Sequence, residues 1–255
     1  MRYFLELSYN GKAYHGWQNQ PNAITVQEVL EKALSTLLGS PIAIVGAGRT
    51  DTGVHAAKMY AHFDFDAPID LSHLAYKLNS YLPKDIAISK IHMVKDNAHA
   101  RFDAKSRTYH YKVSTQKDVF SYDYAYQLTK SLDLNAMNEA CAILVKYTDF
   151  QCFSKVNTDV KTYICEIKEA KWYEKQGNLL FVITADRFLR NMVRAIVGTM
   201  INIGLGKLKP QDLHGIIESK DRGEAGYSVP AQGLSLVDIV YPQEIFIVDS
   251  DLISA

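Results

Sequence analysis

The sequence predicts an α+β protein made of two ferredoxin-like halves around a central, mostly antiparallel sheet. Short apolar segments of strand length alternate with longer segments that have the spacing of amphipathic helices. Their order within each half is β-α-β-β-α-β. This order starts again near residues 96–106, so we expect an N-terminal half over residues 1–100 and a C-terminal half over residues 101–255. With 255 residues the chain can bury a sizeable core.

The first half opens with an alternating apolar segment, residues 3–9, which predicts a strand. The helix predicted next, residues 26–38, has its apolar residues three or four positions apart, on one face. Thr25 is expected to cap its start and Gly39 to end it. The remaining elements expected in this half are strands at residues 42–45, 59–65 and 86–94 and a helix at residues 71–81.

The second half repeats the order, although the two halves share little sequence. Residues 107–113 read R-T-Y-H-Y-K-V, a strand that resembles the opening R-Y-F-L-E-L-S. Residues 245–248, after Pro242, are apolar and could dock as a tail. The other expected elements are helices at residues 133–147 and 188–205 and strands at residues 162–173, 179–185 and 234–241.

The formal charge is balanced, with 28 basic and 28 acidic residues. This counts against a generic nucleic-acid binder, which usually has a basic excess. The charges are unevenly distributed, however. Residues 101–117 hold five basic side chains and one acidic, a local charge of +4, while residues 238–251 hold four acidic side chains and no Lys or Arg. A polarised molecule can present a basic cleft, although ordinary solvated faces explain the same counts equally well.

Cysteine usage and hydropathy predict a cytoplasmic protein with reduced thiols. Cys141, Cys152 and Cys165 are too few and too widely spaced for a disulfide framework. No segment approaches the roughly 20 apolar residues of a membrane span, and Glu6 interrupts what would be the apolar core of a secretory signal. The eight histidines are scattered without an H-E-x-x-H motif, so we expect no metal site.

The segment Val45–His55 reads V-G-A-G-R-T-D-T-G-V-H and is expected to form a tight loop between two strands. It presents Asp51 on a Gly-rich turn, where catalytic groups often lie. Two other interpretations remain open from the residues alone. Asp and Thr in such loops commonly hydrogen-bond their own backbone, and a Gly-rich loop can bind phosphate, although this one lacks the G-K-[ST] ending of a P-loop.

Residues Gly46–Ala56, G-A-G-R-T-D-T-G-V-H-A, closely resemble the signature of the tRNA pseudouridine synthase A (TruA) family. The resemblance implies that Asp51 is the catalytic residue and that the two halves pack as a pseudouridine synthase fold. It also favours an RNA-binding role for Arg49, which could contact phosphate or fill the space left by a flipped base; bracing of the loop is the alternative. His55 belongs to the same motif and is expected to brace the loop.

Three further motifs of the second half carry the resemblance. Arg107–Tyr111 matches R-x-Y-x-Y, whose first tyrosine lines the family's active site, so this role falls on Tyr109. The segment F-L-R-N-M-V-R-A-I-V-G resembles the helix motif whose Arg pairs with the catalytic Asp, here Arg194. A-Q-G-L resembles a segment whose Leu packs near the base, here Leu234. Packing is the alternative for Tyr109 and Leu234, and a structural ion pair for Arg194.

The resemblance implies an isomerase that converts uridine to pseudouridine at positions 38, 39 and 40 of the tRNA anticodon stem-loop. It implies no metal and no small-molecule cofactor, and a homodimer with tRNA lying across both subunits. A second hypothesis is an aspartic protease, because Asp51-Thr52-Gly53 is the D-T-G triplet of that class; the pair of carboxylates it needs would then require a symmetric dimer. A third hypothesis is a non-catalytic RNA-binding module, since aromatic-bearing sheets bind RNA by stacking.

Overall fold

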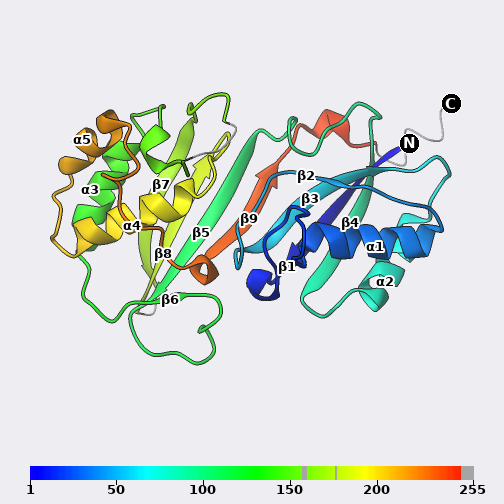
Figure 1. Ribbon diagram of the computed structural model, residues 1–255, viewed down its shortest axis with the longest axis horizontal. Coiled ribbons are helices and arrows are strands. Elements are labelled where there is room, and N and C mark those ends of the chain that lie inside the picture. Colours follow the sequence, from blue (N-terminus) through cyan, green and yellow to red (C-terminus); the bar gives the residue numbers. More distant parts are fainter. Residues whose placement is uncertain (157–159, 176, 248–255) are drawn as a thin grey trace. The chain divides into compact units, whose positions relative to one another are not determined.

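The computed structural model describes residues 1–156, 160–175 and 177–247. These residues form five α-helices and nine strands that pair mostly antiparallel, which confirms the α+β class (Figure 1). Contacts divide the chain into two compact units. Unit 1 holds residues 1–105 together with the described residues from Leu236 onward, and unit 2 holds Ser106–Ser235.

Unit 1 has the predicted β-α-β-β-α-β order. Its central strand β1 pairs antiparallel with β3 and β4, so the strand order is β4-β1-β3-β9. The short β2 pairs with the C-terminal part of β3. The elements are β1 (Arg2–Tyr9), α1 (Val26–Leu38), β2 (Val45–Gly46), β3 (His55–Asp64), α2 (Leu71–Tyr81), β4 (Ile86–Val94) and, from Leu236 onward, the last strand of the chain, β9 (Leu234–Val240).

The helices of unit 1 lie side by side in Figure 1, and their apolar faces are buried. Leu30 and Leu34 of α1 are fully buried, as are Leu5 and Leu7 of β1. Both predicted helix ends of α1 are confirmed: the Thr25 side chain accepts a hydrogen bond from the backbone N–H of Glu28, and Gly39 takes the left-handed conformation at φ 71°.

A cluster of aromatic rings joins β1, β3 and the segment that follows β9. Phe4 lies 5.4 Å from Tyr241 and 6.2 Å from Phe246, measured between ring centroids. The backbone of Phe246 forms an isolated antiparallel β-bridge with Val94 of β4. The apolar tail therefore docks on unit 1 as far as residue 247; residues 248–255 lie outside the described part of the chain.

Unit 2 follows the same order up to its second helix, α4, with the short strand β6 and the helix α5 in addition; the strand after α5, β9, lies mostly in unit 1. Its strands follow the order β5-β8-β7 with antiparallel pairing, and β6 pairs parallel with β5. Gly204 of α4 permits a close crossing of α3, because a Cβ there would lie 2.5 Å from the sulfur of Met137. The elements are β5 (Ser106–Ser114), β6 (Tyr126–Gln127), α3 (Leu134–Leu144), β7 (Ile167–Lys175), β8 (Asn178–Ala185), α4 (Met192–Gly204) and α5 (Asp212–Ser219).

Several boundaries differ from the sequence prediction. The helix expected from residue 188 begins at Met192, because Asn191 adopts a left-handed conformation at φ 67° that a continuous helix cannot contain. The strand expected at residues 42–45 is reduced to the two residues of β2. The eight-residue helix α5 was not predicted. No α-helix in the described part of the chain combines the length and apolar character needed to cross a membrane.

Candidate active site

The loop that carries Asp51 connects β2 to β3 and is held from several sides within unit 1. The buried hydroxyl of Thr50 lies 2.8 Å from the Tyr9 hydroxyl, and the Thr50 carbonyl accepts a hydrogen bond from the backbone N–H of Trp17 at 3.2 Å. The Asp51 carbonyl accepts from the backbone N–H of Val54 at 3.1 Å, which closes the turn. Residues on both sides of the Asp51 side chain therefore have fixed positions.

Glycines permit this close packing of the loop. Gly16 lies against the loop with φ 86°, and a Cβ at Gly16 would approach the Thr50 carbonyl oxygen to 2.4 Å. Gly53, also left-handed at φ 77°, makes the turn just after Asp51. His55 is buried at the start of β3, and its Nδ1 accepts a hydrogen bond from the backbone N–H of Gly11 at 3.0 Å. His55 therefore braces the loop, as the sequence predicts.

The loop presents its two candidate side chains differently. Asp51 is partly buried, whereas Arg49, two positions earlier, is exposed to solvent. A carboxylate and a guanidinium on one braced loop suit contact with a ribose and its phosphate. Asp51 and Arg49 are the predicted site residues that unit 1 holds.

Unit 2 holds another predicted site residue, Tyr109, on β5. The side chain is partly exposed, and its ring meets Phe188 edge-on, with a centroid distance of 5.1 Å and an interplanar angle of 90°. Phe188 precedes α4, and the sequence analysis did not single it out. An edge-on aromatic neighbour fixes the orientation of the Tyr109 ring, which suits a ring that stacks on a base.

Tyr111, two positions further along β5, has a different environment. It is fully buried, and its hydroxyl donates a hydrogen bond to the Pro230 carbonyl at 2.8 Å. Burial raises the pKa of its hydroxyl, against the opposing effect of the Arg194 guanidinium. Spacing alone could not choose between Tyr109 and Tyr111, and the structure makes Tyr111 a packing residue.

Arg194 lies in the first turn of α4, and the segment that leads into β9 orients it. Its Nε donates to the Val229 carbonyl at 2.7 Å, while the backbone N–H of Val229 donates to the Arg194 carbonyl at 3.3 Å. Leu234, five residues after Val229, is 6% exposed at the start of β9. The reciprocal pair of hydrogen bonds sets the direction of the Arg194 side chain.

A second arginine supports the Val229 segment. Arg222 donates from Nη1 to the Gly226 carbonyl at 3.0 Å and from Nη2 to the Ser228 hydroxyl at 3.0 Å. The Asn191 amide donates to the same hydroxyl at 2.7 Å. No sequence motif indicates Arg222, because its partners are mainly backbone carbonyls.

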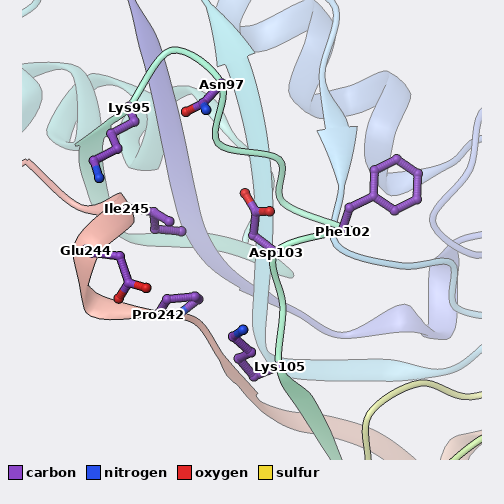
Figure 2. Close-up of a pocket in the computed structure, with 8 residues that line it drawn as sticks. All are labelled: Lys95, Asn97, Phe102, Asp103, Lys105, Pro242, Glu244 and Ile245. Atoms are coloured by element: carbon purple, nitrogen blue, oxygen red, sulfur yellow. The ribbon is translucent and has the colours of Figure 1, made fainter.

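The predicted residues thus fall into two groups. Unit 1 holds Asp51 and Arg49 on one loop, and unit 2 holds Tyr109, Arg194 and Leu234. A cavity of about 330 Å³ in unit 1 contains none of these five; Figure 2 shows it between the segment after β4 and the segment after β9. Within the described residues, no three or more His, Cys, Asp or Glu side chains gather as a group that could hold a metal ion.

Comparison with known proteins identifies the class to which this fold and loop belong. A sequence profile described as tRNA pseudouridine synthase matches residues 7–103 and 140–242. The chain therefore belongs to the tRNA pseudouridine synthase family, whose members are isomerases.

Individual relatives agree with this assignment along nearly the whole chain, and all three described here are named tRNA pseudouridine synthase A. The protein of Parabacteroides distasonis is 56% identical over 97% of this chain and 99% of its own length. That of Bacteroides fragilis is 53% identical over 96% and 98%, respectively. That of Bacillus subtilis is 41% identical over 94% and 99%.

Proposed function

We propose that this enzyme converts uridine to pseudouridine at positions 38, 39 and 40 of the tRNA anticodon stem-loop, and that Asp51 initiates the reaction. The observation that carries the proposal is the presentation of Asp51. Asp51 is partly exposed, on a turn whose neighbours Thr50 and Val54 are fixed by hydrogen bonds. A carboxylate on a fixed turn can attack a ring or a sugar carbon without first reorganising its surroundings.

The reaction is an isomerisation that needs no redox partner. The bond between ribose C1′ and uracil N1 breaks, the base turns, and C1′ bonds to C5. The proton of C5 is lost and N1 gains one, so the atoms balance. The target nucleotide must leave its helical stack to be reached, as in other enzymes that act on a base.

The remaining candidate residues receive supporting roles in this proposal. Tyr109, oriented by Phe188, stacks on the target uracil. Arg194, directed by Val229, takes the role of the arginine that accompanies the catalytic carboxylate in the family motif. The exposed Arg49 contacts the RNA at the position that the flipped base has left, and Leu234 packs near the base. No metal and no small-molecule cofactor enters the scheme.

Two alternatives to this proposal were considered above, an aspartic protease and a non-catalytic RNA-binding module. Membership of an isomerase family leaves the aspartic-protease hypothesis without support, because the D-T-G triplet is part of a longer synthase signature. A non-catalytic RNA-binding module would retain tRNA binding and lack the reaction. Activity of the purified wild-type protein distinguishes the two.

The test uses an unmodified tRNA transcript with uridines at positions 38, 39 and 40, treated with wild type, Asp51→Ala and Asp66→Ala. Asp66 is an exposed carboxylate after β3 and serves as the matched control. We expect pseudouridine at these positions with wild type and Asp66→Ala and none with Asp51→Ala, as mapped by chemical sequencing. Full modification by Asp51→Ala would overturn the assignment of Asp51, and modification confined to other positions would overturn the site specificity.

We further propose that the enzyme acts as a cytoplasmic homodimer, with tRNA lying across both subunits. The three cysteines are unpaired and buried, as suits a reducing compartment. Analytical ultracentrifugation at micromolar concentration is expected to give twice the 28.7 kDa mass of the chain. A species at the monomer mass that modifies tRNA at the full rate would contradict the dimer.

A further inference from the structure

The segment between β4 and β5 exposes a phenylalanine although its backbone is tightly held. Phe102 is 75% exposed. On both sides of it, unit 1 holds the chain: the Ala98 carbonyl accepts a hydrogen bond from Arg2 at 2.9 Å, and the backbone N–H of Lys105 donates to the Val240 carbonyl at 2.8 Å. Binding residues often lie on connecting segments that a rigid scaffold holds in place, and Phe102 lies on such a segment.

Hydrogen bonds within the segment fix the position of the ring further. The His99 backbone N–H donates to the Asp103 carboxylate at 2.7 Å, and the Asp103 N–H donates back to the His99 carbonyl at 3.1 Å. His99 Nδ1 accepts from the backbone N–H groups of Arg101 and Phe102, at 3.1 and 3.4 Å. The turn that carries Phe102 therefore closes around the His99 side chain.

The Phe102 ring lies at the outer end of a row of aromatic side chains. The centroid of Phe102 lies 4.2 Å from that of His99, which in turn lies 4.7 Å from that of the buried His62. Burial, and then the nearby Arg2 charge, lower the pKa of His99. This row orients Phe102 while leaving most of its surface accessible.

An arginine lies over the exposed ring, and a lysine is exposed three positions further along the chain. The Arg101 guanidinium carbon lies 5.7 Å from the Phe102 ring centroid, and both Arg101 and Lys105 are exposed. They begin the basic segment of residues 101–117. The neighbouring carboxylate of Asp103 is turned to the His99 N–H of its own segment. Phe102 is one of the residues that line the cavity. Figure 2 shows its side chain directed away from the other labelled residues, so the ring faces outward from the cavity.

We propose that Phe102 is a stacking platform for an unpaired nucleobase of the RNA substrate, with Arg101 and Lys105 contacting the adjacent phosphates. An aromatic ring flanked by Arg and Lys is the combination that binds single-stranded nucleotides without sequence preference. RNA fits this surface better than an apolar protein partner does, because the Arg101 guanidinium lies over the ring and Lys105 is exposed on the same segment. The inference rests on the proposed function, which supplies an RNA substrate, and adds a contact that none of the four sequence motifs contains.

The test compares Phe102→Ala, Phe102→Leu and Phe102→Trp with Tyr76→Ala. Tyr76 lies on α2 of the same unit and is 71% exposed, so it matches Phe102 in exposure without lying on the basic segment. The dissociation constant for an unmodified tRNA transcript is measured by fluorescence anisotropy, and kcat and KM by pseudouridine formation. We expect Ala and Leu to raise Kd and KM about tenfold or more, with kcat within twofold, since base–aromatic stacking has this strength. Trp and Tyr76→Ala are expected to stay near wild type.

The result separates this inference from the proposed function. A wild-type enzyme that forms no pseudouridine would overturn the function itself. If wild type is active but Phe102→Ala and Phe102→Leu bind tRNA as tightly as Tyr76→Ala, only the stacking proposal is wrong. The stacking proposal is also wrong if these two variants sediment as monomers and those monomers bind tRNA with the wild-type Kd. If Phe102→Ala does not fold, the contrast between Leu and Trp decides, because both retain apolar bulk.

Discussion

Gly16 shows how a single residue outside the signature positions the loop that carries Asp51. Its φ of 86° and the 2.4 Å that would separate a Cβ from the Thr50 carbonyl leave no room for a side chain. Thr50 immediately precedes Asp51, so any displacement caused at Gly16 reaches the carboxylate. The accuracy of the site therefore depends on the segment between β1 and α1 as well as on the signature.

Gly16→Ala is expected to reduce both stability and kcat. Left-handed backbone at Ala costs about 1–2 kcal/mol, and displacement of Thr50 adds to this cost. Urea denaturation measures the loss of stability, and pseudouridine formation measures kcat. Gly215→Ala is the control, because a Cβ there meets nothing within 4 Å; it should be neutral or stabilising in α5. Wild-type kcat in Gly16→Ala would contradict the role of this contact.

His62 predicts how stability depends on pH. Burial, and then the Arg2 charge, lower its pKa to about 4, and its Nδ1 accepts the Ala100 backbone N–H at 3.2 Å. The unfolded histidine, with a pKa near 6.5, binds a proton more readily than the folded one. The free energy of unfolding should therefore fall as the pH is lowered from about 6.5 towards 4. Denaturation of wild type and His62→Gln across this window should show a shallower dependence in the variant. Identical slopes would contradict this assignment.

At the scale of secondary structure, the start of α4 and the segment before β9 act together on Arg194. Gly226 contacts α4 closely: its N–H donates to the Thr199 hydroxyl at 2.8 Å, and a Cβ at Gly226 would lie 2.3 Å from the backbone nitrogen of Thr199. Val229 then meets Arg194 through two hydrogen bonds. The direction of the arginine is thus a property of two elements in contact.

Arg222→Met should lower kcat with little change in tRNA affinity, because Arg222 supports the segment that directs Arg194. We expect a decrease of roughly tenfold, of the order that follows from losing one charged hydrogen bond. Lys220→Met is the matched control, since Lys220 lies nearby and pairs with Asp149 on the surface. In an Arg194→Lys background, Arg222→Met should have little further effect on kcat. Fully additive losses would mean that Arg222 only stabilises the fold.

The helices also show which structural features could be predicted from the sequence and which could not. The caps of α1 follow from the side chain of Thr25 and the freedom of Gly39, which are local signals. The start of α4 was misplaced because Asn191 is held by Ser228, 37 positions away. α5 escaped prediction because its first turn has no capping side chain. In the candidate site, motifs identify Asp51 and Arg194, whereas the Val229 carbonyl that orients Arg194 carries no side-chain signal.

At the scale of the whole molecule, a protein of zero net charge is proposed to bind a polyanion. The basic residues of segment 101–117 would concentrate the attraction, so affinity should still depend strongly on salt. If about five phosphates are neutralised, the logarithm of affinity should fall against the logarithm of salt concentration with a slope of about −4. Anisotropy titrations between about 50 and 200 mM KCl would measure this slope. Lys112→Gln should make the slope shallower by about one. A flat dependence would show that binding does not rest on phosphate contacts.

The central claim is that the Asp51 carboxylate starts an exchange of the C1′–N1 bond for a C1′–C5 bond. The most direct measurement is the release of tritium to water from tRNA labelled at uridine C5, because forming the new bond expels that hydrogen. Wild type should release label in proportion to the uridines at positions 38, 39 and 40. Asp51→Asn should bind the same tRNA with unchanged affinity and release none. Release by Asp51→Asn at the wild-type rate would contradict the account.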